Sequence, residues 1–219
     1  GFDRQHIYNN EREMTTEAVN FINYNYRADN PFFIWLHYID PHAPYTCHEE
    51  YFKDFENDRW YKENDKILKL KPDNLESKNK PYYAWSGEGY IPPIVFSKNK
   101  YNLNYYIACY DTEIRYADLL IGNLLKNIKG NTLVVLTADH GESLGDHNAY
   151  FCRGTSIYDE LLHIPLVLKD NRYFKGGKRV STIISSTDIV PTILNTIEPI
   201  WYFLNQNRFD GKDLKATAN

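Results

Sequence analysis

Apolar residues recur with helical spacing in three parts of the chain. Between Leu103 and Ile128 the gaps alternate between three and four residues, which predicts one long helix that buries a single face. An earlier helix is expected to be capped at Thr15–Glu17 and to end before Asn30–Pro31, because proline cannot continue a helix. A third is expected to start at Thr187–Asp188 and to run to about Ile197.

Three short apolar runs separate these helices and predict buried strands. The run from Phe32 to Ile39 is continuous, as expected for a strand that is buried on both faces. Two β-branched runs, Thr132 to Ala138 and Ile164 to Leu168, predict further strands. Strands that alternate with helices favour an α/β fold with a mainly parallel sheet sandwiched by helices.

Polar clusters follow two of these strands, where open parallel sheets bind their ligands. Divalent cations bind carboxylate oxygen and imidazole nitrogen, so an acid beside a histidine at a strand end predicts a metal site. Without further context, an Asp-His-Gly turn, a loop histidine and a solvated Asp-His pair explain the same residues. The two clusters consist of Asp40 and His42, and of Asp139, His140, Glu142, Asp146 and His147.

The composition narrows the possible functions. The chain has 219 residues, 42% of them hydrophobic, and carries 25 basic and 29 acidic residues for a net charge of −4. This balance gives no support for binding to nucleic acid or to a membrane surface. No apolar run is long enough to cross a membrane. The compartment is unknown from the sequence, with a soluble cytoplasmic protein slightly favoured.

The cysteines and the insertion complete the outline of the chain. Three cysteines, Cys47, Cys109 and Cys152, are an odd number without metal-type spacing, so no disulfide framework is expected. Residues 47 to about 100 are polar, aromatic and irregular, which predicts a long insertion. We expect residues 1–219 to form one catalytic domain interrupted by this insertion.

Seven segments, in order, resemble the later portion of the sulfatase family, within the alkaline phosphatase superfamily. They begin with "GFD" at residues 1–3 and end with "DGKDL" at residues 210–214. The others are "NPFFIWLHYIDPHAPY" (30–45), "YDTEIRYADLLIGNLLKNI" (110–128), "NTLVVLTADHGESLGDH" (131–147), "RGTSIYDELLHIPLVL" (153–168) and "VSTIISSTDIVPTIL" (180–194). The resemblance therefore extends over nearly the whole chain.

The resemblance implies hydrolysis of a sulfate ester with the help of a divalent metal, commonly calcium, with Mn, Mg or Zn as alternatives. Asp139 and His140 match the family's metal ligands. His42 matches the histidine that binds the ester or leaving-group oxygen, and Arg153 stands where the family usually has an anion-binding lysine. We expect His42 and Arg153 to be catalytic and substrate-binding, and His147 to bind substrate. Because the pKa of arginine exceeds ~12, His42 is the better general acid.

The chain departs from the family pattern in two ways. None of its cysteines or serines lies in the Cys/Ser-x-Pro/Ala-x-Arg motif that gives the formylglycine nucleophile, and the family's paired N-terminal aspartates are absent. We therefore expect a longer enzyme in which an upstream segment supplies both. The polypeptide alone should not turn over, and an open sheet edge would favour self-association.

Two other functions fit the same motifs. The first is a related phosphodiesterase, phosphonate monoester hydrolase or phosphoethanolamine transferase. Such enzymes often hold a second metal through an additional histidine, a role that His147 could fill. Cys152 stands at about the spacing where transferases place that ligand, which favours a sulfatase. The second alternative is a non-catalytic relative that binds anions or partners. A sulfatase is expected to act on a small-molecule or glycan sulfate ester.

Overall fold

A computed structural model describes residues 6–8, 10–56, 66–70, 90–92, 95–97, 99–153, 157–174, 176–215 and 217. The chain combines helices with short strands, and it divides into two compact units. The first unit comprises residues 1–128 and 139–164, and the second comprises residues 129–138 and 165–219. In the described part of the chain, no helix is both long and apolar enough to span a membrane.

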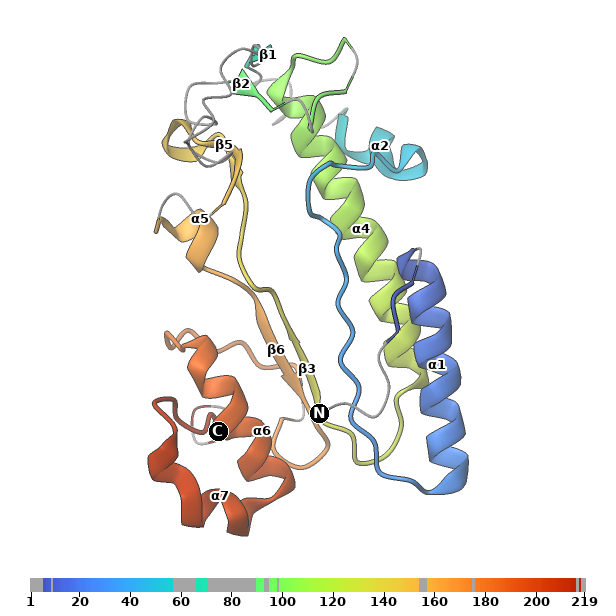
Figure 1. The fold of residues 1–219 in the computed structure, drawn as a ribbon, viewed down its shortest axis with the longest axis vertical. Coiled ribbons are helices and arrows are strands. Elements are labelled where there is room, and N and C mark those ends of the chain that lie inside the picture. The colour runs from blue at the N-terminus through green and yellow to red at the C-terminus, as the bar shows by residue number, and fades with distance from the viewer. Residues whose placement is uncertain are drawn as a thin grey trace. The chain divides into compact units, whose positions relative to one another are not determined.

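Helix α4 is the longest element of the first unit. It covers Leu103–Asn127, which confirms the helix that the apolar spacing predicts. Its buried residues include Tyr106, Ile107, Leu120 and Leu124. Helices α1 (Glu11–Ala28) and α2 (Glu49–Glu56) both pack against α4, and Figure 1 shows α1 running beside its lower half.

Helix α1 begins earlier than the sequence predicts. Its cap is Asn10, whose side chain accepts a hydrogen bond from the amide of Glu13 at 2.8 Å. The expected cap at Thr15–Glu17 is therefore wrong, and Thr15 lies inside the helix with its hydroxyl 2.8 Å from the carbonyl of Glu11. Threonine serves both as a cap and as an interior residue that bonds back to the preceding turn, so its presence alone does not fix a helix start.

The segment from Phe32 to Ile39 is extended, but it is not assigned as a strand. Its side chains alternate, so only one face is covered, and the expectation of a strand buried on both faces is wrong for this structure. Phe32, Ile34 and Leu36 pack against the core that α1 and α4 share. Phe33, Trp35 and Ile39 are 64%, 71% and 56% exposed. Apolar side chains occupy both faces of this segment, but the described residues cover only one of these faces.

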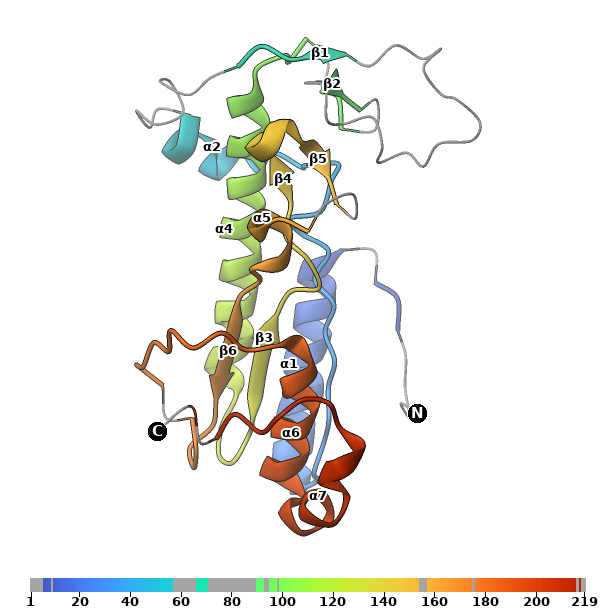
Figure 2. The ribbon, with the colours of Figure 1, turned by 90° about the vertical axis from the view of Figure 1, so that its left-hand side faces the viewer.

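Two short antiparallel strands cover the other end of α4 (Figure 2). Strand β4 is Ser143–Leu144 and strand β5 is Tyr150–Cys152. The rings of Tyr150 and Phe151 join Tyr106 of α4 in one buried core. The 3-10 turn η3 (Asp146–Asn148) connects the strands, and helix α5 (Asp159–Leu162) follows them.

The second unit pairs two strands and carries a helical end. Strand β3 (Val134–Thr137) pairs antiparallel with β6 (Leu166–Lys169). Helix α6 (Ile189–Ile197) packs on α7 (Pro199–Asn205), with η4 (Ser186–Asp188) before them and η5 (Gln206–Arg208) after them.

The mainly parallel sheet that the sequence predicts is not found among the described strands. Their one parallel pair is β1 (Lys69–Leu70) with β2 (Tyr90–Ile91). Both strands lie in the predicted insertion, which also contains α2; residues 57–65 and 71–89 of the insertion lie outside the described residues. Apolar runs reveal strands, but the direction of pairing depends on residues far apart in the sequence.

Cys47 and Cys109 form a disulfide, which corrects the expectation that none would be present. The fold brings their Cα atoms to 4.4 Å although 62 positions separate them in the sequence. An odd cysteine count cannot reveal such a pair, because one cysteine can remain outside it. The bond attaches the segment before α2 to the second turn of α4.

Reduction of this disulfide should destabilise the protein. A loop of this length corresponds to about 4 kcal/mol in the chain-entropy description of the unfolded state. We expect Cys47→Ser to lower the melting temperature and to remove its dependence on reductant, as measured by thermal denaturation with and without dithiothreitol. Cys152→Ser is the control and should keep that dependence. Equal melting temperatures for the oxidised and reduced wild type would contradict the prediction.

Gly141 should tolerate no side chain, whereas Gly122 should. A Cβ on Gly141 would lie 1.9 Å from the carbonyl oxygen of Glu160, but no described atom outside the backbone of α4 lies within 4 Å of a Cβ on Gly122. We expect Gly141→Ala to destabilise by about 1–3 kcal/mol, and Gly122→Ala to stabilise by about 0.4–1 kcal/mol. Urea denaturation of both variants tests this, and the same sign for both would contradict it.

Glu113 makes stability depend on pH. Burial on α4 is the largest cause that raises its pKa to about 8, and nearby Asp40 and Glu11 raise it further. The folded state therefore holds this proton more tightly than the unfolded state, so stability should fall as pH rises from about 4.5 to about 8. Melting temperatures across this range should decline less in Glu113→Gln than in wild type. Parallel profiles, or the same change in the exposed control Asp118→Asn, would contradict this.

Candidate functional site

The loop after the extended segment carries His42 at the surface of the first unit. The amide of His42 donates to the carbonyl of Ile39 at 2.9 Å, which closes a turn in the chain. The Nδ1 atom of His42 lies 2.5 Å from the carbonyl oxygen of Ala43. A carbonyl can only accept, so Nδ1 carries a proton and Nε2 is the ring atom left for a ligand.

The side chains of Asp139 and His140 lie close together. The Nε2 atom of His140 lies 3.7 Å from Oδ2 of Asp139, whose side chain is 77% exposed. The Nδ1 atom of His140 lies 2.7 Å from the carbonyl oxygen of Gly141, so Nδ1 donates and Nε2 of the neutral ring can bind a cation. This geometry fits two ligands of one metal ion.

The described residues do not contain a complete metal site. Among them, no group of three or more histidine, cysteine, aspartate or glutamate side chains could hold a metal ion. A divalent cation needs four or more ligands in most protein sites. Asp139 and His140 therefore fit as part of a donor set whose other members are not found in the described part of the chain.

A buried carboxylate, Glu142, stands at the centre of the predicted site. Its side chain is 5% exposed, and its Oε2 lies 3.4 Å from Nη1 of Arg153. Burial raises the pKa of Glu142, and the opposing influences come first from Arg153 and then from Tyr45, His140 and His42. Arg153 contacts the carboxylate and His140 is two residues away in the sequence, whereas His42 belongs to a separate loop and acts on the carboxylate through its charge.

Two tyrosines lie close to the Glu142 carboxylate. Burial, followed by the charge of Glu142, raises the pKa of Tyr45 well above its usual value and raises that of Tyr110 to about 12. Their rings meet edge to face at 5.7 Å. The hydroxyl of Tyr45 and Oε1 of Glu142 are both buried. The two side chains interact with each other, which raises the pKa of Tyr45 and lowers that of Glu142 against the effect of burial.

His147 lies in a different setting. Its Nδ1 lies 3.0 Å from Oε1 of Glu160, and its ring stacks on Tyr158 at 3.7 Å with an angle of 8°. Its backbone has a φ of 51°, in the left-handed region. In the described residues no contact links this ring to His42, His140 or Arg153. The expectation that His147 binds substrate stays a prediction.

Sequence reasoning missed the roles of Glu142 and Tyr45. Glu142 was one of several strand-end acids, and nothing in the residues beside it separates a buried carboxylate from a solvated one. Its burial depends on Tyr45 and Tyr110, which reach it from two other segments. The "GFD" motif at residues 1–3 and residues 154–156 of the Arg153 motif lie outside the described residues.

Comparisons with known proteins agree with the motifs. The family model named Sulfatase matches residues 3–198. The uncharacterized sulfatase YidJ of Escherichia coli is 31% identical over 182 residues, which cover 83% of this chain and 34% of YidJ. An arylsulfatase of Clostridium perfringens is 27% identical and covers 83% of this chain and 37% of its own length. Arylsulfatase K of Canis lupus familiaris is 31% identical over 42% of this chain and 16% of its own.

The fold agrees as well. The crystal structure of a "putative sulfatase" from Bacteroides thetaiotaomicron superposes with a TM-score of 0.50 at 19% identity, over 100% of this chain and 48% of that one. The chain spans about a third of the length of YidJ and of the clostridial enzyme. Because the family model covers nearly all of the sequence, this chain belongs to the sulfatase family.

Proposed function

We propose that this chain forms the anion-binding part of a sulfuric ester hydrolase of the arylsulfatase type. The observation that carries the proposal is the pairing of Arg153 with the buried Glu142, a carboxylate on which the charges of His42 and His140 also act. A guanidinium and an imidazole in one region suit the negative charge of sulfate or of its monoester. The names of the relatives support sulfate over other anions.

Each group has a distinct role in this proposal. The guanidinium of Arg153 binds two sulfate oxygens in fork geometry, because Glu142 takes one of its five N–H donors and leaves the others available. The Nε2 atom of His42 protonates the leaving-group oxygen, which requires the imidazolium form because Nδ1 is already a donor. His147 contacts the organic part of a small-molecule or glycan sulfate ester.

Asp139 and His140 supply two ligands of a divalent metal, for which calcium is the first candidate. When bound, the ion would stabilise the charge on the sulfate oxygens. The sequence contains no Cys/Ser-x-Pro/Ala-x-Arg motif. We therefore propose that the 219 residues bind the anion but do not turn over an ester by themselves, the formylglycine nucleophile and the remaining ligands being supplied by other polypeptide.

A phosphate ester is the second candidate substrate. His147 donates from Nδ1 to the Glu160 carboxylate, an arrangement that histidine ligands of metals commonly show. A second metal beside His147 would suit phosphoryl transfer. The relative affinities of the chain for sulfate and for phosphate, measured in the same experiment, decide between the two functions.

Calorimetric titration of the chain with sodium sulfate, in the presence of calcium, tests the proposal. Loss of a charge-assisted hydrogen bond costs about 1.5–3 kcal/mol, so Arg153→Ala and His42→Ala should each weaken binding about tenfold or more. Arg115→Ala removes the same charge from an exposed position of α4 and should leave the affinity unchanged. Inorganic phosphate is titrated in parallel, and tighter binding of phosphate would favour the second function.

The same titration tests whether a bound metal ion contributes to sulfate binding. EDTA should weaken sulfate binding in the wild type, and in Asp139→Ala the chelator should have no further effect because the ion is already lost. No heat with either anion, with calcium present or absent, would exclude both functions. Release of nitrophenol from nitrophenyl sulfate by the chain alone would contradict the absence of a nucleophile.

A further inference from the structure

Two carboxylates hold the two ends of the His42 loop, which we define as residues 39–46. At its first end, Oε1 of Glu11 accepts hydrogen bonds from the amides of Ile39 and Asp40, the latter at 2.9 Å. Glu11 is the first residue of α1. One side chain therefore satisfies two successive amides of an extended segment that makes no strand ladder in the described structure.

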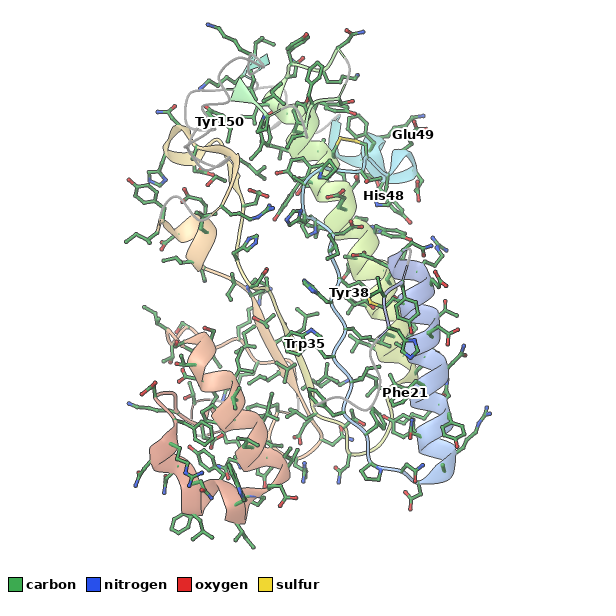
Figure 3. All side chains as sticks on the ribbon, in the orientation of Figure 1. Phe21, Trp35, Tyr38, His48, Glu49 and Tyr150 are labelled. Atoms are coloured by element: carbon green, nitrogen blue, oxygen red, sulfur yellow. A yellow bond between two sulfur atoms is a disulfide. The ribbon has the colours of Figure 1, made fainter. Side chains whose placement is uncertain are left out.

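Glu113 holds the other end. It lies within α4 and is fully buried, and its Oε1 accepts from the amide of Thr46. The preceding residue, Thr112, accepts from the amide of His48 at 3.1 Å. The His48 ring stacks on Tyr116 of the same helix at 4.2 Å, and Figure 3 shows His48 beside α4. The loop thus leaves α1 and returns to α4 through side-chain acceptors at both ends.

Ionisation of Glu11 and Glu113 is energetically unfavourable in these surroundings. Both pKa values are raised, by burial first, and the carboxylate of Asp40 adds to both. Tyr45 and Tyr110 also face Glu113. The second oxygens, Oε2 of Glu11 and Oε2 of Glu113, are buried without a hydrogen-bond partner among the described residues. A buried acid that leaves an oxygen unsatisfied does not maximise stability, which points to a role for its other contacts.

The loop that Glu11 and Glu113 hold at its two ends carries His42. Between the two held ends, the loop makes a single turn, with the His42 amide bonded to Ile39. The ring of His42 is at the surface, and its own hydrogen bond is to Ala43 within the loop. Nothing else in the described contacts fixes this ring, so its position follows from the position of the loop.

We propose that Glu11 and Glu113 are positioning residues that fix the His42 loop through its backbone amides, and so place the imidazole for the anion. The inference rests on the proposed function for the role of His42, whereas the carboxylate-to-amide contacts stand independently of it. Removal of Glu11 should free the first end of the loop, and removal of Glu113 should release the Thr46 amide although the disulfide at Cys47 remains. Both helices should stay packed, because α1 and α4 also share a separate apolar core.

Amide hydrogen exchange measured by NMR on the whole chain tests the contacts. In Glu11→Ala the amides of Ile39 and Asp40 should exchange about tenfold faster or more, and in Glu113→Ala the amide of Thr46 should do so. Glu17→Ala on α1 and Asp118→Ala on α4 remove exposed acids from the same helices and should leave these rates unchanged. Wild-type exchange at all three amides in both alanine variants would overturn the proposal.

The ring protons of His42 give the second readout. During titration with inorganic sulfate, their shift should report an affinity about tenfold weaker in the alanine variants than in the controls. Faster loop exchange with an unchanged affinity would also overturn the proposal, since the carboxylates would then hold the loop without placing His42. If His42 of the wild type does not respond to sulfate at all, the proposed function fails, and the exchange rates alone decide whether the two acids fix the loop.

A second pair of variants applies if an alanine variant does not fold. Glu113→Gln keeps an oxygen acceptor without the charge, and Glu113→Leu removes the acceptor at similar size. Thr46 should exchange at the wild-type rate in the glutamine variant and faster in the leucine variant. Equal rates in the two variants would overturn the role of the acceptor, whatever their overall stability.

Discussion

The packing of one face of α4 is the constraint on which the rest of the first unit depends. Leu124 near the end of this face packs with α1, and Tyr106 near its start packs with Phe151 of β5. Between them lie Cys109, Thr112 and Glu113, which attach the chain after His42 by a disulfide and two hydrogen bonds. The histidine loop and the Glu142 segment can meet because both are fixed to the same helix.

The sequence predicted those parts whose cause is local. The period of apolar residues in α4 revealed the helix, because a one-sided helix needs that period wherever it lies. The polar residues at predicted strand ends include His42 and His140, and the family motifs add Arg153. Arg153 pairs with Glu142, and the charges of both histidines act on the same carboxylate. Their roles as site residues stay predictions.

What the sequence could not supply is pairing over long distances. The disulfide joins Cys47 to Cys109, and the antiparallel partner of β3 is β6. The burial of Glu142 requires Tyr45, which is nearly a hundred positions away in the sequence. Each of these contacts depends on which surfaces the folded chain brings together, and composition or spacing around one residue carries no record of that.

Glu142 and Glu113, both buried in the first unit, show two ways to keep a carboxyl group out of water. Glu142 is compensated by a cation, Arg153, and by nearby imidazoles, and it therefore belongs to the part of the surface where an anion would compete for the same donors. Glu113 is compensated by a backbone amide and lies among other acids, whose negative charge would repel an anion. In the proposed function, a ligand that binds Arg153 would share its guanidinium with Glu142. The paired carboxylate would then orient the fork and lower the net positive charge around a bound anion, which would favour readily reversible binding over tight retention of sulfate.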